Sequence, residues 1–211
     1  MMGLLGRLKN RPLSFFDGGI AMCYKFYVPK HQELDHLDEI LEYLESRNVL
    51  VKTGNVTPGD VAAVIANSRE LRPQPFGMLW GYRLSNGKLV YNARSETASE
   101  KALFADGMRQ RRCLIPAAHY YEWQRAKTGS QPYLLHPKGE TEMLLAGIYR
   151  FEGNQPVFSV LTRTPPEQIA HIHDRMPVIL PREALSDWLN PKYRGEEILK
   201  AAMTDMEFCP C

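Results

Sequence analysis

Short apolar segments with the composition of β-strands recur along most of the chain, and short turns rich in Gly, Pro and Asn separate them. Only a few stretches have the 3.6-residue periodicity of helices. No repeat, low-complexity linker or domain boundary divides the chain after Met22. This pattern favours an α+β protein, a single domain built on a curved, barrel-like, mainly antiparallel sheet with peripheral helices. Strands are expected at residues 22–28, 61–66, 76–84, 89–93, 112–115, 119–123, 133–136, 143–149, 157–161 and 176–180.

The helical segments are fewer and more widely spaced. Residues 31–47 are expected to form an amphipathic helix, because Leu and Ile side chains recur on one face and acidic side chains on the other. Residues 85–87, with the sequence Ser-Asn-Gly, predict a tight turn that joins two strands in a hairpin. Further helices are expected at residues 96–108, 166–172 and 181–189, the last with a proline at its start.

Composition bounds the function less sharply than the fold. The chain has 211 residues, of which 44% are hydrophobic, enough for a buried core in one domain. A formal net charge of +2 excludes a histone-like polycation but leaves room for a local basic groove. No stretch approaches the ~18 apolar residues of a membrane span. The first 21 residues lack the continuous apolar run of a secretory signal, so we expect a cytoplasmic protein.

Four cysteines, Cys23, Cys113, Cys209 and Cys211, are too few and too scattered for a disulfide framework. The terminal Cys209-Pro210-Cys211 could chelate a metal or form a redox pair. A metal site needs further ligands, however, and no histidine lies nearby in the sequence. We therefore expect this segment to be a frayed tail.

Glu122 is the polar residue with the most unusual context, because it lies in the aromatic run Tyr120-Tyr121-Glu122-Trp123. A buried, charged carboxylate is costly, so burial would raise its pKa and suit it to general acid/base catalysis. The alternation of a strand also allows Glu122 to face solvent, and the pattern alone favours that interpretation.

Other candidates are equally ambiguous when each is taken alone. Cys23 could be a nucleophile or a small buried hydrophobe. His173, followed by Asp174 and Arg175, could combine a proton shuttle with a phosphate-binding guanidinium, or it could lie in a polar loop before a strand.

Two further residues belong to the same set. Trp80 could stack on a nucleobase or fill the core. Asn92, in Asn92-Ala93-Arg94, could belong to a site or to a simple turn. A cysteine, a histidine and an asparagine in one chain also permit a cysteine-protease-like interpretation.

Taken in order, the motifs closely resemble the SOS-response-associated peptidase (SRAP) family over about residues 22 to 189. Several ordered motifs carry the resemblance, and each would be weak alone. They are Met22-Cys23, Trp80-Gly81, Asn92-Ala93-Arg94-Ser95-Glu96-Thr97, Arg112-Cys113-Leu114-Ile115-Pro116-Ala117, Tyr121-Glu122-Trp123 and His173-Asp174-Arg175-Met176-Pro177. This chain departs from the family where Tyr24-Lys25 replaces the common Gly-Arg after the cysteine.

The resemblance implies a single SRAP-like domain, residues 22–211, that protects abasic sites in single-stranded DNA. It implies lyase-like chemistry, in which an N-terminal cysteine forms a stable thiazolidine with the abasic sugar, and a peptidase (hydrolase) activity in self-processing. It implies no metal and no organic cofactor. The residues it implies are Cys23 as nucleophile, Asn92 to position the cysteine, Glu122 and His173 as the acid/base pair, Arg94 and Arg175 for phosphates, and Trp80 to line the DNA groove.

The start of the chain conflicts with this chemistry, because the nitrogen of Cys23 is an amide while Met22 precedes it. We expect translation to start at Met22 and residues 1–21 to be an extension absent from the active form. The alternative is self-cleavage between Met22 and Cys23. Three hypotheses follow: a covalent crosslinker of abasic sites in the DNA damage (SOS) response, a cysteine peptidase, and a noncovalent DNA-binding module. We expect a monomer whose partner is single-stranded DNA.

Overall fold

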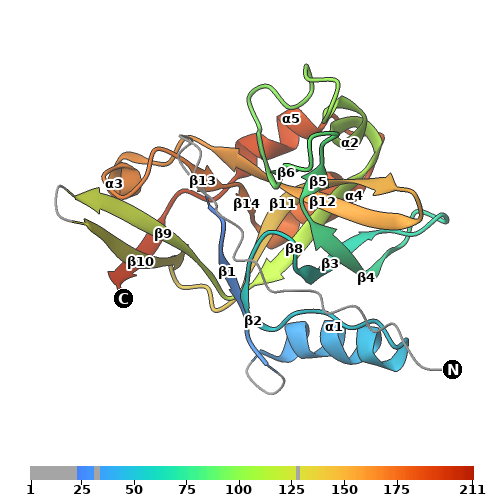
Figure 1. The fold of residues 1–211 in the computed structure, drawn as a ribbon, viewed down its shortest axis with the longest axis horizontal. Helices are drawn as coiled ribbons and strands as arrows, with labels where there is room; N and C mark the ends of the chain where they lie inside the picture. Colours follow the sequence, from blue (N-terminus) through green and yellow to red (C-terminus); the bar gives the residue numbers. More distant parts are fainter. Residues whose placement is uncertain (1–22, 31–33, 127–128) are drawn as a thin grey trace, which may run out of the picture.

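The computed structural model describes residues 23–30, 34–126 and 129–211. The first residue of the strand expected at 22–28 and the first three of the helix expected at 31–47 lie outside these ranges. Two large sheets and one two-stranded hairpin make up the β-structure of the described residues; the two large sheets lie on opposite sides of the molecule in Figure 1, with the helices at the periphery. This arrangement confirms the predicted α+β class with a curved, mainly antiparallel sheet.

Five strands close into a small barrel, because each apolar segment pairs with the next around a ring. The antiparallel pairs run from β4 to β3, β8, β11 and β12 in turn, and β12 then pairs with β4 in parallel. Closure leaves these strands without an open edge. The barrel strands are β3 (Val61–Asn67), β4 (Pro73–Trp80), β8 (Arg112–Ala117), β11 (Met143–Glu152) and β12 (Gln155–Arg163).

A second, five-stranded antiparallel sheet lies beside the barrel, in the order β15-β10-β9-β1-β2. Its members are β1 (Phe26–Val28), β2 (Gly54–Val56), β9 (His119–Ala126), β10 (Gly129–Pro137) and β15 (Met206–Pro210). The prediction of a frayed C-terminal tail is wrong, because Cys209 pairs with Leu134 in the sheet and the Cys211 amide donates to the Pro132 carbonyl. Backbone pairing with β10 orders the segment.

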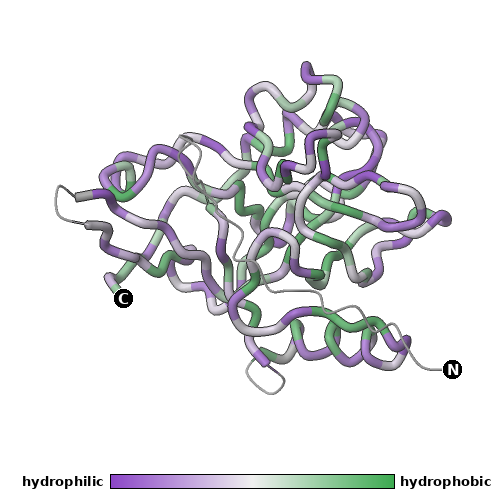
Figure 2. Tube along the Cα trace, in the orientation of Figure 1, coloured by the Kyte–Doolittle hydropathy of each residue, from purple (hydrophilic) through white to green (hydrophobic). Residues whose placement is uncertain are grey.

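Helix α1 (Asp35–Ser46) confirms the amphipathic pattern. Its leucine and isoleucine side chains at 37, 40, 41 and 44 are buried, and Figure 2 shows the hydrophobic residues on one side of the helix. The other helical segments are short; in Figure 1, α2, α4 and α5 lie around the barrel, whereas α3 lies beside the five-stranded sheet. They are α2 (Ala105–Gln110), α3 (Glu167–Ala170), η1 (Arg182–Ala184), α4 (Leu185–Leu189), α5 (Gly195–Ile198) and η2 (Leu199–Ala201). No helix in the described ranges is long and apolar enough to cross a membrane.

The helix expected at residues 96–108 is wrong over most of its length, since only Ala105–Gln110 is helical. Its beginning is held elsewhere: the Ser95 amide donates to the Thr162 carbonyl of β12, and Glu96 binds Arg175. These long-range contacts fix the start of the segment, and residues 97–104 form turns before α2 begins.

Shorter strands form where longer ones were expected. The strand expected at 76–84 breaks at Gly81, whose φ of 120° suits glycine and whose amide donates to the Phe158 carbonyl. The turn at 85–87 joins β5 (Tyr82–Arg83) to β6 (Leu89–Val90) as predicted. After Tyr91 the chain leaves this hairpin, and β7 (Asn92–Arg94) pairs with β12 in parallel. The strand expected at 176–180 is divided at Val178 into β13 (Met176–Pro177) and β14 (Ile179–Leu180).

Candidate active site

The site forms where the start of β1 meets β9. Phe26 pairs with Tyr120, and the Tyr121 amide donates to the Lys25 carbonyl, so the antiparallel alignment continues back towards Cys23. The main-chain nitrogen of Cys23 donates a hydrogen bond to Glu122 Oε1 at 2.7 Å. The fold thus joins two candidates that lie far apart in the sequence.

Glu122 is buried, with 2% of its surface exposed, so the solvent-facing interpretation of this residue is wrong. Burial raises the pKa of its carboxyl group to about 8, and the charge of Asp174 raises it further, against the hydrogen bond from the Cys23 amide. The second oxygen, Oε2, has no hydrogen-bond partner in the described part of the chain. Near neutral pH this carboxyl group can both give and take a proton.

Cys23 is equally buried, at 1% exposure. Burial raises the pKa of its thiol, and the nearby charge of Glu122 raises it further, so the sulfur is a protonated thiol at rest. Its backbone φ is 22°, a conformation that is strained for a residue with a side chain. A neighbouring base has to take the thiol proton before the sulfur can act as a nucleophile.

Asn92 reaches the same residue from the barrel. Strand β7 pairs with β12 so that Asn92 stands opposite Val160. From there its Nδ2 donates to the Cys23 carbonyl at 3.1 Å. The main chain of Cys23 is therefore bound on both sides, at its nitrogen by Glu122 and at its carbonyl by Asn92.

Trp80 lies beneath this site rather than on the surface. It is fully buried, its Nε1 donates to the Tyr91 carbonyl at 2.8 Å, and its ring packs 4.9 Å from that of Phe26. The expectation that Trp80 lines a DNA groove is therefore corrected, because a ring without exposed surface cannot contact DNA. Its role is to support β1 and the segment before Asn92.

His173 lies on the segment between α3 and β13 and is partly buried. Its Nδ1 is 3.0 Å from Asp174 Oδ1 and 3.1 Å from the Arg175 amide nitrogen. Burial lowers the pKa of the imidazole, which favours the neutral ring at physiological pH. Within the described ranges no hydrogen bond joins His173 to Cys23 or Glu122, so the expected acid/base pair is not assembled by direct contact.

The two arginines expected to bind phosphate differ in their surroundings. Arg175 is 8% exposed, and its guanidinium binds both Glu96 oxygens, at 2.8 and 2.7 Å, and the Thr162 carbonyl at 2.6 Å. A phosphate would have to displace Glu96 from this fork, so the structure supports a structural role for Arg175. Arg94, at the end of β7, is exposed. It is the arginine of the pair that solvent can reach.

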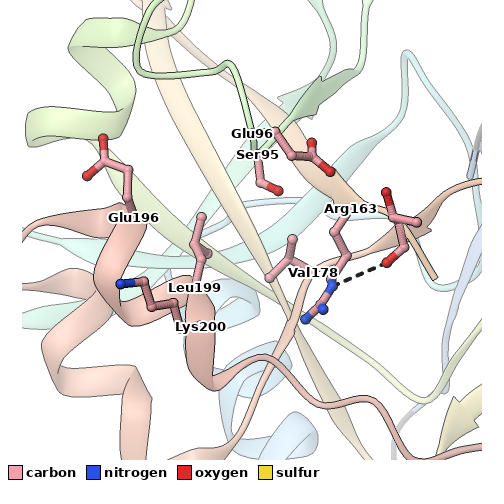
Figure 3. A pocket seen from close by; sticks show the side chains of 8 residues that line it. Ser95, Glu96, Arg163, Val178, Glu196, Leu199 and Lys200 are labelled. Carbon is pink, nitrogen blue, oxygen red and sulfur yellow. Dashed lines mark hydrogen bonds between the residues drawn. The ribbon is translucent and has the colours of Figure 1, made fainter. Parts of the chain in front are cut away.

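Glu96 also borders a hollow of about 340 Å³ at the end of β12 (Figure 3). Arg163 and Lys200 contribute positive charge to it, whereas Glu96 and Glu196 contribute negative charge. This mixed lining selects no single charge class of ligand. The remaining lining residues are Ser95, Thr164, Val178 and Leu199.

Sequence reasoning missed an aromatic surface beside Cys23, on the face of the five-stranded sheet opposite Glu122. The signal was present in the alternation of β9, whose residues 119, 121 and 123 share one face. Ring stacking and a cation–π contact hold the surface together across β1 and β9. Tyr24 stacks on Trp123 at 4.6 Å, Tyr27 stacks on His119 at 4.8 Å, and Lys25 Nζ lies 4.1 Å from the centre of the Tyr121 ring.

The fold and the site together define the class: an α+β barrel domain in which the main-chain nitrogen of a buried cysteine is bound to a buried glutamate. A model of the SOS response associated peptidase (SRAP) family matches residues 22–210. The chain belongs to this family.

Curated relatives support the assignment. The chain is 34% identical over 199 residues to abasic site processing protein YoqW of Bacillus subtilis, a match that covers 86% of each chain. It is 26% identical over 193 residues to abasic site processing protein YedK of Escherichia coli, covering 86% of this chain and 85% of that one. A crystal structure of a Bacteroides thetaiotaomicron protein shares the fold, with a TM-score of 0.72 at 24% identity over 89% of this chain and 91% of that one.

Proposed function

We propose that this protein recognises abasic sites in single-stranded DNA and crosslinks to them through Cys23, once Cys23 is the N-terminal residue. Membership of the SRAP family and similarity to abasic site processing proteins support the proposal. The observation that carries it is the 2.7 Å hydrogen bond between the Cys23 nitrogen and the buried Glu122 carboxylate. That bond puts a proton-transfer group on the atom that would attack the sugar.

The first step joins the amine of Cys23 to the ring-opened aldehyde of the abasic sugar. The nitrogen lone pair attacks the carbonyl carbon, the carbonyl oxygen takes a proton, and the nitrogen loses one, which gives a carbinolamine. This intermediate then loses its hydroxyl group and a proton as water and becomes an imine. Glu122, whose pKa is raised to about 8, is protonated often enough near neutral pH to assist the departure of water.

The second step closes the ring. The Cys23 thiol gives up its proton, its sulfur adds to the imine carbon, and the imine nitrogen takes a proton. Because sulfur and nitrogen belong to one residue, the addition is intramolecular and a five-membered thiazolidine results. The overall reaction consumes the amine, thiol and aldehyde and releases one water. In this scheme Asn92 donates a hydrogen bond to the Cys23 carbonyl and holds it in place. His173 exchanges protons with the reacting groups through intervening water molecules.

DNA binding in this proposal needs no sequence readout. Arg94 is the exposed cation that would contact phosphate, and the aromatic surface around Trp123 offers rings on which bases can stack. Affinity should therefore fall with added salt.

Self-cleavage between Met22 and Cys23 is a second candidate function, favoured by the same hydrogen bond. In the 211-residue chain the bound nitrogen is the amide of the Met22–Cys23 bond, so a protonated Glu122 would donate to the leaving amine. The thiol of Cys23 would lose its proton and attack the Met22 carbonyl carbon, and the C–N bond would break to give a thioester and the free Cys23 amine. Water would then hydrolyse the thioester, which releases residues 1–22 as a carboxylic acid and returns the thiol. We also propose that residues 1–21 are absent from the active form, whether by this cleavage or by translation from Met22 and removal of that methionine.

The crosslinking proposal is tested with protein that begins at Cys23 and single-stranded DNA that carries one abasic site. A protein–DNA band that survives heat and denaturant on a gel is expected. DNA with a tetrahydrofuran analogue, which lacks the aldehyde, should give no such band. Cys23→Ser should bind DNA without forming the heat-stable band. Absence of the band from protein that starts at Cys23 would refute the proposal.

Self-cleavage is tested separately by intact mass measurement of the 211-residue chain over time. Loss of residues 1–22 is expected, and Cys23→Ala should preserve the full mass. A wild-type chain whose mass stays constant would leave initiation at Met22 as the source of the free amine.

A further inference from the structure

Tyr120 carries a polar group that the mechanism above does not use. The residue is fully buried, and its hydroxyl has no hydrogen-bond partner among the described residues. Buried hydroxyl groups in folded proteins nearly always have a partner, because leaving one unpaired is unfavourable. A phenylalanine would fill the same space without this cost, so the hydroxyl needs an explanation outside packing.

The position of Tyr120 ties this hydroxyl to the site. Tyr120 and Glu122 are two residues apart on β9 and share its inward face, and Tyr120 pairs with Phe26, three residues after Cys23. Glu122 Oε2 is the other unpaired polar atom on this face. Burial raises the pKa of the Tyr120 phenol, and its electrostatic interactions with Cys23 and Glu122 raise the pKa further, so the phenol stays protonated.

Two unpaired groups therefore share the inward face of one strand, a hydroxyl that can donate a hydrogen bond and a carboxyl oxygen that can exchange a proton. Tyr91 does not share this property, because its side chain is only partly buried and water can reach it. A small oxygen-bearing group bound between Tyr120 and Glu122 would satisfy both atoms.

We propose that the Tyr120 hydroxyl is a further catalytic group, which donates a hydrogen bond to the aldehyde oxygen of the abasic sugar while Glu122 Oε2 exchanges a proton with the same oxygen. The inference rests on the proposed crosslinking function. As the Cys23 amine attacks the carbonyl carbon, the π electrons of the carbonyl move to oxygen, and the hydroxyl of Tyr120 stabilises the developing charge. Glu122 then protonates this oxygen, which leaves as water when the imine forms.

The test compares Tyr120→Phe with wild type, both beginning at Cys23. Tyr82→Phe is the matched control, since Tyr82 is an equally buried tyrosine in the other core cluster. The rate of heat-stable adduct formation is measured with abasic single-stranded DNA. Noncovalent affinity is measured with the tetrahydrofuran analogue, and thermal unfolding reports stability.

Tyr120→Phe is expected to slow adduct formation about 100-fold, the size typical of removing one donor to a developing oxyanion. Its affinity for the analogue should be unchanged and its Tm should not fall, because the ring is kept and an unpaired hydroxyl is removed. Tyr82→Phe should react at the wild-type rate. Equal rates for Tyr120→Phe and wild type would overturn the inference, as would a slower rate matched by an equal loss of analogue binding. A wild-type protein that forms no adduct would instead refute the proposed function itself.

Discussion

Protonation of Glu122 should leave a measurable mark on the stability of the 211-residue chain. Burial raises the pKa of this carboxyl group from 4.5 to about 8 in the folded protein. Between these values the folded state holds a proton that the unfolded state has lost. Stability therefore decreases as pH rises through this window, because the native state binds more protons than the unfolded state.

The magnitude follows from the shift. A change of this size corresponds to about 5 kcal/mol between the acid and alkaline ends of the window. Glu122→Gln keeps the shape of the side chain and cannot ionise, so it should lose this dependence. The difference in unfolding free energy between Glu122→Gln and wild type should grow from near zero at about pH 4 to most of this value near pH 8.

The measurement is urea unfolding of both proteins across this pH range, followed by circular dichroism. Other groups also titrate there. Burial lowers the pKa of His119 to about 4, and His173 shifts in the same direction, so both histidines make stability rise with pH at the acid end. They are present in both proteins and cancel in the difference.

Glu140→Gln, at an exposed carboxylate, is the control and should follow the wild-type curve throughout. Parallel curves for wild type and Glu122→Gln would refute the reasoning. They would mean that Glu122 is ionised in the folded chain and that it accepts the Cys23 hydrogen bond as a carboxylate at all pH values tested.

Three further changes test the support around the site. Asn92→Ala removes the hydrogen bond to the Cys23 carbonyl, and we expect about tenfold slower adduct formation with unchanged affinity for the aldehyde-free analogue, measured on the gel. Trp80→Phe removes a buried hydrogen bond and leaves a small cavity, so it should lower the free energy of unfolding, measured in urea, by about 2 kcal/mol. Because Trp80 is buried, the affinity for DNA should not change. Arg175→Lys loses the forked contact with Glu96 and should lower the free energy of unfolding by a similar amount, about 2 kcal/mol. A loss of DNA affinity at unchanged stability would instead indicate that Arg175 binds phosphate.

The sequence predicted elements well where local pattern and burial coincide. The helix that became α1 was recognisable because its apolar residues follow the helical period and form the face that the protein buries. The hairpin at residues 85–87 was recognisable because its turn residues specify the geometry locally. The helix prediction for residues 96–108 was wrong because long-range contacts decide the structure there. Ser95 binds β12 and Glu96 binds Arg175, and no local sequence pattern reveals these contacts.

The candidate site shows the same division. The sequence placed Glu122 among aromatic residues but could not say which face of β9 is covered, and the pattern alone favoured the wrong one. For Trp80 the strand pattern allowed a core position, and the family resemblance assigned it to the DNA groove instead; the layers that bury it come from distant segments, β1 and β12. The contact between Asn92 and Cys23 depends on the parallel pairing of β7 with β12, a long-range choice that neither residue encodes.

The two candidate functions place different demands on one nitrogen. Cleavage before Cys23 needs Glu122 to donate a proton to that nitrogen as an amine leaves. Crosslinking needs the same nitrogen as a free amine that attacks carbon, with Glu122 close enough to move protons. A single hydrogen bond of 2.7 Å satisfies both, so the geometry that would release Cys23 from residues 1–22 would also prepare it for the sugar. Under the two proposals, cleavage and crosslinking would be successive uses of one site, and a Glu122→Gln chain should be impaired in whichever of the two steps the wild-type protein performs.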